Sequence, residues 1–584
     1  MGYTMIENLT PKKIKSLTIN ELNVLCDELR VVIHDTVTRC GGHLASNLGS
    51  VESTVAMFNV FDFPNDKVVF DVGHQCYSYK LLSGRYDRFS TLRQEGGISG
   101  FPKRTESEYD SYDTGHAGTS VSAAIGLAKA RDLRSENHNV IAYIGDGSFN
   151  NGLIYEALSS LKILNTKILI ILNDNGMSIS PTVGGMYDII EKIKTDGRAD
   201  GIRLLESFGL RYIGVKNGND LDDMLSAMSE AKELLKESSV ILHIATKKGK
   251  GYEFSEEHPT NTHGVPPFGS VKTTEYSEIL GETLCEMAQK DSSLVVVSAA
   301  MKEALGLSEF FEKYPDRAFD VGICEENASV LCASMAAGGL KPYYAIYSTF
   351  LQRSFDEIIH DVCAQDMPVT FCIDRAGISG ADGETHQGVF DISYLSLIPN
   401  LTIAAPKDTE EFRQMLQFSV SYNHPLAIRY PRAGRLLFDV DKQNQESIRV
   451  GKWEYLHKQE ENPSKVTVLA TGERCLLIAM KILHNLEEQG KTFDVVNARF
   501  IKPLDKEFLQ SMQSDYVITM EDNVLLGGFG SMVNNALIEM GKDCKIKNFA
   551  YRDEFIPQGS ISSLQAQFGV SCQEIEAYIS KILQ

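Results

Sequence analysis

Short runs of apolar residues, many of them β-branched, recur along the chain and predict strands. Most of these runs are followed by Gly, Asn, Asp or Arg, which is typical of a strand that ends in a turn. They occupy residues 140–144, 168–172, 240–244, 294–297, 342–346, 369–373, 401–404, 466–470, 493–496 and 516–519.

Helical periodicity fills much of the sequence between these runs. Apolar residues recur there at intervals of three and four, which predicts amphipathic helices. These segments are 120–133, 153–164, 220–235, 328–338, 476–489 and 532–540. Because strands and helices alternate, we predict an α/β fold with mainly parallel sheets that helices cover on both faces.

Two segments lack this periodicity and indicate domain boundaries near residues 275 and 440. Residues 249–275 combine Gly, Pro, Thr and charge, as expected of a linker or an ordered active-site loop. The second segment, 435–464, is polar and charged. We therefore predict domains at 1–275, with an active-site loop near 249–270, at 276–440 and at 441–584.

The composition supports several buried cores and excludes some classes of protein. Of 584 residues, 43% are hydrophobic and 23% are charged, which is typical of a globular protein and not of a disordered, collagen-like or coiled-coil chain. The net charge of −21 repels phosphate backbones, so we expect no binding to nucleic acid.

Cysteine usage and hydropathy predict a cytoplasmic protein. The 11 cysteines are scattered and form no C-x-x-C pair, which favours reduced thiols over a disulfide framework. The first residues lack the apolar core of a signal peptide, and no stretch approaches the ~20 apolar residues that span a bilayer. We therefore expect no membrane association.

Two polar turns follow two successive predicted strands. Gly-Asp-Gly at 145–147 follows the first strand, and Asn-Asp-Asn at 173–175 follows the second. In a parallel crossover Asp146 and Asn175 reach the same sheet edge, where their oxygens are suitable Mg²⁺ ligands. Glycine backbone and a helix N-terminus favour phosphate, so the pattern predicts a diphosphate bridged through metal. Gly-Asp-Gly taken alone is also compatible with an ordinary strand-to-helix turn.

Other candidate residues also have plain structural explanations. Glu325 lies between a strand and a helix, where an acid often serves only to cap the helix. Arg375 and Arg432 follow predicted strands and suit a phosphate, although either is equally compatible with a salt bridge. Five histidines in Gly-rich or loop-like segments suit proton transfer near a reactive carbon, or a structural role: His43, His74, His116, His263 and His386.

The spacing from Gly-Asp-Gly to Asn-Asp-Asn resembles the signature of thiamine diphosphate enzymes. Nearly the whole chain, moreover, resembles the 1-deoxy-D-xylulose-5-phosphate synthase family, which is related to transketolase. The segments that carry this resemblance are GGHLASNLGSVE, FDVGHQCYSYKLLSGR, GGISGFPKRTESEYD, TGHAGTS, TKKGKGYE, IYSTFLQRSFDEIIHDV, IDRAGISGADGETHQG and RYPRAG. The family condenses pyruvate with D-glyceraldehyde 3-phosphate, releases CO₂ and supplies isoprenoid, thiamine and pyridoxal synthesis.

The resemblance implies three doubly wound domains of the transketolase-like, thiamine diphosphate-binding type, and a homodimer. It also implies a role for each matching residue. Asp146, Asn175 and the carbonyl of Met177 would bind Mg²⁺, Glu325 would activate the cofactor, and Phe350 would stack on its pyrimidine. The other cofactor contacts would be His74, Gly115, His116, Ala117, Gly147, Ser148 and Tyr252. Substrate contacts would be His43, Asp382 and His386, which we also rate as catalytic, with His263, Tyr347, Arg353, Arg375 and Arg432.

Two departures from the family pattern stand next to these residues. The family commonly has Glu-Gln-His where this chain has Glu325-Glu326-Asn327, and GDGSFNNG replaces a run of smaller residues. Neither removes a residue implied in activation, metal binding or phosphate binding. The alternatives are a transketolase that splits ketose phosphates, which shares the cofactor motifs, and a non-catalytic scaffold.

Overall fold

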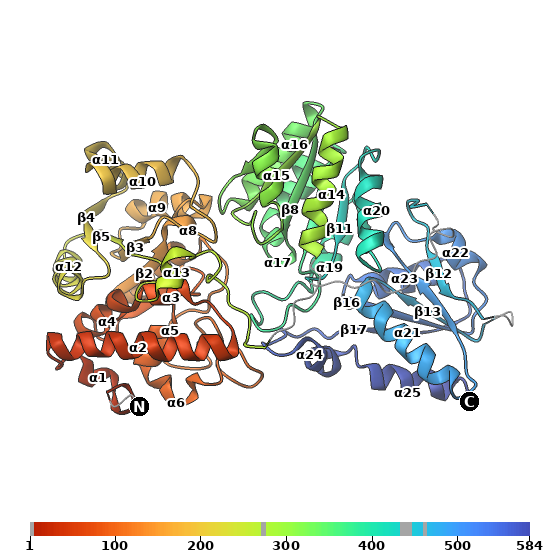
Figure 1. Ribbon diagram of the computed structural model, residues 1–584, viewed down its shortest axis with the longest axis horizontal. Coiled ribbons are helices and arrows are strands. Elements are labelled where there is room, and N and C mark those ends of the chain that lie inside the picture. The colour runs from red at the N-terminus through yellow and green to blue at the C-terminus, as the bar shows by residue number, and fades with distance from the viewer. Residues whose placement is uncertain (1–4, 270–275, 433–446, 460–463) are drawn as a thin grey trace. The chain divides into compact units, whose positions relative to one another are not determined.

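The computed structural model describes residues 5–269, 276–432, 447–459 and 464–584 (Figure 1). The chain divides into two compact units, one of Met1–Val271 with Gly322–Cys324 and one of Lys272–Val321 with Glu325–Gln584. The predicted domain boundaries at 275 and 440 fall in the ranges 270–275 and 433–446, which lie outside the described residues.

The first unit is built on a parallel sheet in the order β1-β2-β3-β5-β4. Its strands are β1 (Lys67–Phe70), β2 (Val140–Gly145), β3 (Leu169–Asp174), β4 (Leu210–Asn217) and β5 (Ser239–Ala245). Successive side chains of a strand point to opposite faces, so Ile141 and Tyr143 enter one core while Ala142 and Ile144 enter another. The unbroken apolar run in β2 follows from this burial on both faces.

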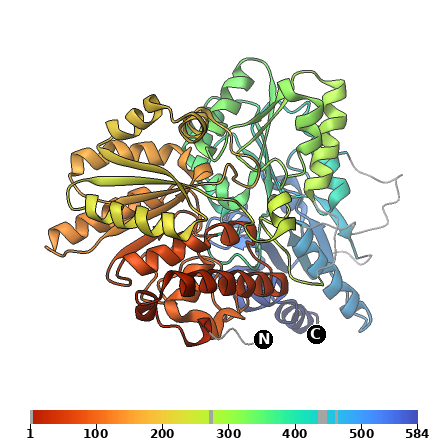
Figure 2. The ribbon, with the colours of Figure 1, turned by 60° about the vertical axis from the view of Figure 1, so that its left-hand side comes forward.

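Helices cover both faces of the first sheet (Figure 2). One face packs against α2 (Ile19–Cys40), α4 (Val51–Val60) and α12 (Leu221–Leu234), and the other against α7 (Ser120–Leu133), α9 (Gly152–Leu164), α10 (Gly185–Asp196) and α11 (Ala199–Ser207). Shorter helices are α1 (Pro11–Ile14), α3 (Ala45–Gly49), α5 (Tyr77–Lys80), α6 (Tyr86–Phe89), α8 (Asp146–Phe149) and α13 (Glu253–Glu257). The last of these lies within the segment expected to be aperiodic.

The second unit contains two sheets. The first of them has the order β15-β10-β11-β9-β8-β6-β7 and comprises β6 (Leu294–Ser298), β7 (Ala318–Asp320), β8 (Lys341–Tyr347), β9 (Thr370–Asp374), β10 (Thr402–Ala404), β11 (Leu426–Arg429) and β15 (Phe500–Lys502). The other has the order β12-β14-β13-β16-β17 and comprises β12 (Glu454–His457), β13 (Val466–Ala470), β14 (Asp494–Asn497), β16 (Tyr516–Val524) and β17 (Lys545–Tyr551). Pairing is parallel except for β15 on β10 and β12 on β14.

A shared core joins these two sheets. Ile346 and Phe371 of one sheet belong to the same buried apolar cluster as Leu469 and Val517 of the other. The helices of this unit are α14 (Tyr276–Lys290), α15 (Ser308–Lys313), α16 (Glu325–Ala337), α17 (Ser348–Leu351), α18 (Phe355–Glu357), α19 (Asp391–Ser396), α20 (Thr409–Ser419), α21 (Glu473–Glu487), α22 (Lys506–Ser511), α23 (Phe529–Glu539), α24 (Ile561–Phe568) and α25 (Cys572–Ile582).

The predicted α/β fold with mainly parallel sheets is confirmed. Each of the ten predicted strands and six predicted helices overlaps an element of the same kind. Within the described ranges, no helix has both the length and the apolar composition needed to cross a bilayer.

Candidate active site

Asp146 and Asn175 lie together at the carboxyl edge of the first sheet. Gly145 and Asn173 are register partners on β2 and β3, so the residues that follow them emerge side by side. The backbone N–H of Asn175 donates to Oδ1 of Asp146 at 3.2 Å. This contact confirms the predicted juxtaposition of the two turns.

The surroundings of Asp146 fit a hard cation. Its side chain is 1% exposed, and the Thr182 hydroxyl donates to its Oδ2 at 2.6 Å. Burial, and then the nearby Asp174, raise the pKa of Asp146 to about 7, because neither a dry environment nor a second carboxylate favours its charged form. A bound cation would reverse this penalty, so the donor set suits Mg²⁺.

The loops after β2 and β3 approach each other closely at Gly147. A Cβ added to Gly147 would lie 2.9 Å from Cβ of Ser178, so only glycine lets the two loops approach this closely. The backbone N–H of Met177 donates to Oδ1 of Asn175 at 3.1 Å, which holds the second loop in a tight turn. Ser148 is buried in α8, next to Gly147.

Lys248 is a candidate that the sequence reasoning missed. Its buried ammonium group donates to the carbonyl of Ser178. Burial lowers the pKa of Lys248 to about 8, and the charge of Asp146 partly opposes that shift. Lys248 follows β5, a neighbour of β3, so the reasoning that located Asp146 and Asn175 would also have found it.

The segment containing Gly115, His116 and Ala117 is fixed to the same sheet. Asp71, which follows β1, accepts hydrogen bonds from the backbone N–H groups of Gly118 at 2.8 Å and Ser120 at 3.1 Å. These hydrogen bonds hold the loop that precedes α7 at the carboxyl end of β1. Its predicted cofactor contacts stay a prediction.

Three half-buried histidines from distant parts of the sequence form one cluster in the first unit. Ring centroids lie 5.5 Å apart for His43 and His74, 5.3 Å for His43 and His263, and 5.4 Å for His74 and His263. Burial, and then Lys248 and the other two imidazoles, hold the pKa of His263 well below its usual range. A neutral imidazole can both donate and accept a proton, which suits general acid–base chemistry.

Tyr252 lies elsewhere in the first unit. Its ring stacks on His34 with centroids 3.8 Å apart, and its hydroxyl lies 2.9 Å from Nδ1 of His34. The side chain is 37% exposed. The structure therefore gives Tyr252 a partner on α2, and its predicted role at the cofactor stays a prediction.

Glu325 is the first residue of α16 in the second unit, and it is more than a cap. Its side chain is 5% exposed, and its Oε2 is buried without a hydrogen-bond partner among the described residues. Burial raises the pKa of Glu325 to about 7, against a smaller opposing effect of Arg353. A buried carboxyl group with a raised pKa and a vacant hydrogen-bonding position fits the ring nitrogen of an aminopyrimidine.

The raised pKa of Glu325 predicts a pH-dependent stability. The folded state holds this proton up to about pH 7, whereas the unfolded chain releases it near 4.5, so stability falls as the pH rises between these values. Glu325→Gln removes this dependence. Its free energy of unfolding, compared with that of the wild type, should therefore rise by about 3 kcal/mol between pH 4.5 and 7. Urea unfolding of the cofactor-free protein at several pH values measures this gain. With Glu326→Gln as the control, parallel curves for wild type and Glu325→Gln would contradict the assignment.

Aromatic and basic side chains of the second unit form a further group. The rings of Tyr347 and Phe350 stack with centroids 5.6 Å apart, and His386 meets Phe350 edge-on, also at 5.6 Å. The guanidinium carbon of Arg375 lies 3.7 Å from the centroid of the Tyr347 ring, and Nη1 lies 2.9 Å from Oδ2 of Asp374. The structure thus brings together four residues that the sequence predicted for cofactor and substrate.

The remaining predicted residues of this unit are not joined to this group by the contacts described. Asp382 lies in a loop whose ends are paired through Gly377 and Gly388. Arg432 has an exposed side chain, and its carbonyl accepts a hydrogen bond from the backbone of Tyr276. The predicted substrate contacts of Asp382, Arg432 and Arg353 stay predictions.

Comparison with known proteins decides the family. Residues 6–203 match the family model described as 1-deoxy-D-xylulose-5-phosphate synthase, 272–434 match the pyrimidine-binding domain of transketolase, and 451–575 match the transketolase C-terminal domain. A 1-deoxy-D-xylulose-5-phosphate synthase of Clostridium tetani is 43% identical, with 98% of each chain covered. The chain belongs to the 1-deoxy-D-xylulose-5-phosphate synthase family.

Other relatives agree with this assignment. The 1-deoxy-D-xylulose-5-phosphate synthase of Clostridium beijerinckii is 43% identical over 98% of both chains, and that of Clostridium kluyveri is 41% identical over 98% of this chain and 97% of its own. The predicted family is confirmed, and with it an enzyme of the transketolase-like, thiamine diphosphate-dependent class.

Solved transketolases are more distant. A split-gene transketolase is 24% identical over 53% of this chain and 98% of its own, with a TM-score of 0.48. The Campylobacter jejuni transketolase is 19% identical over 97% of this chain and 100% of its own, with a TM-score of 0.43. The roles of individual residues in this 1-deoxy-D-xylulose-5-phosphate synthase family member rest on its own geometry.

Proposed function

We propose that this chain condenses pyruvate with D-glyceraldehyde 3-phosphate to give 1-deoxy-D-xylulose 5-phosphate and CO₂. The observation that carries the proposal is the match over 98% of the chain to relatives named for this synthesis. We further propose, on the resemblance and composition, a cytoplasmic homodimer.

The cofactor would be thiamine diphosphate with Mg²⁺. Asp146, Asn175 and the carbonyl of Met177 would bind the metal, and the buried ammonium group of Lys248 would face the diphosphate charge. When bound, thiamine diphosphate supplies the nucleophilic carbon and the electron sink that decarboxylation needs. Glu325, whose pKa burial raises to about 7, would hydrogen-bond the ring nitrogen of the aminopyrimidine, and Phe350 offers an apolar face for that ring.

Polar residues in each unit are proposed substrate contacts. His43 and His263 can bind the carboxylate of pyruvate and exchange protons with the carbonyl oxygens, while His74 would line the cofactor. Arg375 and Arg432 would bind the phosphate of the triose through guanidinium groups. Asp382, His386, Tyr347 and Arg353 would complete the substrate contacts.

Product analysis with two substrate pairs tests this proposal against the transketolase alternative. The purified protein with thiamine diphosphate and Mg²⁺ should convert pyruvate and D-glyceraldehyde 3-phosphate to a deoxypentulose phosphate, identified by mass. Conversion of xylulose 5-phosphate and an aldose phosphate, without reaction of pyruvate, would replace the proposal with a transketolase. The absence of both products from a folded, cofactor-loaded protein would support a non-catalytic scaffold.

A further inference from the structure

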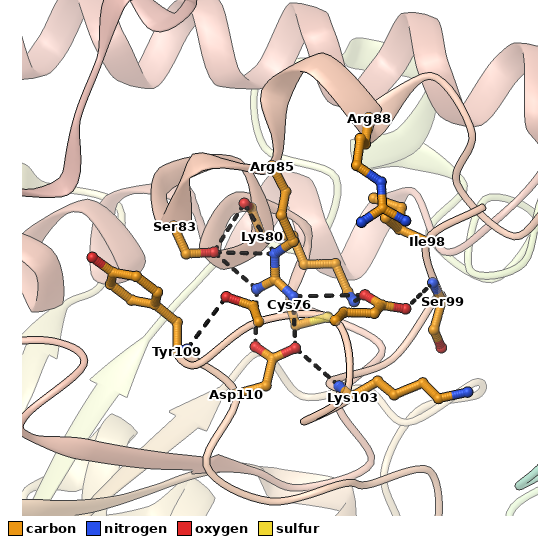
Figure 3. Close-up of polar contacts among 12 residues, drawn as sticks. Cys76, Lys80, Ser83, Arg85, Arg88, Ile98, Ser99, Lys103, Tyr109 and Asp110 are labelled. Carbon is orange, nitrogen blue, oxygen red and sulfur yellow. Dashed lines mark hydrogen bonds and ion pairs between the residues drawn. The ribbon is translucent and has the colours of Figure 1, made fainter. Parts of the chain in front are cut away.

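Four charged side chains form a buried ion network in the first unit (Figure 3). Nζ of Lys80 lies 2.7 Å from Oε2 of Glu106, and Nη1 of Arg85 lies 3.6 Å from the same oxygen. Arg85 also forms a two-pronged contact with Asp110, at 2.6 and 2.9 Å. The side chains are 0–8% exposed, so each of the two positive and two negative charges is stabilised by its partners and not by water.

The two acids of this network also hold the backbone of residues 99–103, which we call the wall segment. Oε1 of Glu106, the oxygen that does not contact Lys80, accepts a hydrogen bond from the backbone N–H of Ser99 at 2.5 Å. Oδ2 of Asp110 accepts from the backbone N–H of Lys103 at 2.9 Å. Both ends of the wall segment are therefore attached to buried charges.

The wall segment packs against the residues that carry the histidines. The ring of Phe101 meets that of His43 edge-on, with centroids 5.8 Å apart, and Phe101 is buried. A Cβ added to Gly73, next to His74, would lie 2.3 Å from Cδ of Pro102. Displacement of the wall segment would therefore loosen the packing around both imidazoles.

We propose that Glu106 is a positioning residue, which holds the wall segment against His43 through the Ser99 N–H. Buried ion pairs often contribute little net stability compared with apolar side chains of similar size, which is compatible with a positioning role for this one. One carboxylate oxygen is fixed by Lys80, and the other then presents a fixed acceptor to the backbone. The proposal rests on the proposed function only in that His43 acts on the substrate.

A matched pair of double variants tests this role without leaving a buried charge unpaired. Lys80→Met with Glu106→Gln keeps an oxygen for the Ser99 N–H, whereas Lys80→Met with Glu106→Leu removes it. In both, Arg85 keeps its contact with Asp110. Glu108→Gln, at an exposed carboxylate of the same loop, is the surface control. Circular dichroism and the thermal midpoint establish that each variant is folded.

Two readouts are taken on each variant. Hydrogen exchange of the peptide that contains Ser99, measured on the cofactor-free protein, reports the position of the wall segment independently of turnover. In the variant with Lys80→Met and Glu106→Leu, the Ser99 peptide should exchange about tenfold faster than in the wild type. Its kcat should fall about tenfold, because a small displacement of a catalytic group lowers the rate strongly. Its affinity for thiamine diphosphate should be unchanged. The variant with Lys80→Met and Glu106→Gln should stay within about threefold of wild type in both measurements.

Equal behaviour of the two double variants, or faster exchange with unchanged kcat, would overturn the proposal. If the Leu variant does not fold, Glu106→Asp takes its place, because the shorter acid keeps the charge but withdraws the acceptor, and the same two changes are expected. A wild-type protein without synthase activity would refute the proposed function, while the exchange measurement would still decide whether Glu106 holds the wall segment.

Discussion

Replacing Glu325 by alanine should lower the rate of sugar phosphate formation by about 10³-fold, within the range that positioned acid–base groups contribute. Glu325 is buried and has an oxygen without a partner among the described residues, and burial raises its pKa to about 7. It can therefore hold a proton at neutral pH and donate it to a ring nitrogen. Alanine provides neither the proton nor the acceptor.

Steady-state assays of Glu325→Ala with saturating thiamine diphosphate and Mg²⁺ measure this loss. Glu326→Gln is the matched control, because it changes the adjacent carboxyl group, for which the family commonly has Gln. The control should retain activity within about threefold. A Glu325→Ala rate close to that of wild type would falsify the assignment of Glu325 as the activating residue.

Replacing Asp146 by alanine should abolish the magnesium-dependent retention of thiamine diphosphate. The carboxylate is the one acidic group in the proposed ligand set, and its Oδ1 also fixes the loop of Asn175 through a 3.2 Å hydrogen bond. Loss of a supporting group around a metal typically costs 10–100-fold in affinity, so loss of a ligand should cost at least about 100-fold.

Equilibrium dialysis with and without Mg²⁺ measures this retention directly. Asp188→Asn is the control, because Asp188 is an exposed acid in the first turn of α10. Wild type and control should bind the cofactor more tightly with Mg²⁺ than without it, and Asp146→Ala should show no such difference. Normal magnesium-dependent binding by Asp146→Ala would place the metal elsewhere.

Site residues could be predicted from the sequence most reliably where they come directly after a buried parallel strand. The runs of β2 and β3 are apolar throughout, so their ends, and with them Asp146 and Asn175, could be located from the sequence. Two strands at sheet edges were missed, because charged residues interrupt the apolar residues of β17 and only three apolar residues mark β1. The antiparallel strand β15 was missed because it joins a sheet built from an earlier part of the chain.

Contacts between distant segments could not be predicted from the residues alone. Nothing in the local patterns around His43, His74 and His263 indicates that their rings meet, because that contact depends on how three loops pack. The burial of Lys80 could not be predicted either, because a lysine in a short helix is ordinarily exposed. Its partner Glu106 appears only in the folded chain.

Release of CO₂ from pyruvate, measured with and without D-glyceraldehyde 3-phosphate, tests the proposed synthase most directly. The purified protein is supplied with thiamine diphosphate and Mg²⁺, and Glu325→Ala serves as the inactive control. We predict release that the triose phosphate strongly stimulates, with one deoxypentulose phosphate formed for each CO₂. No release from a protein shown by dialysis to hold the cofactor would contradict the account.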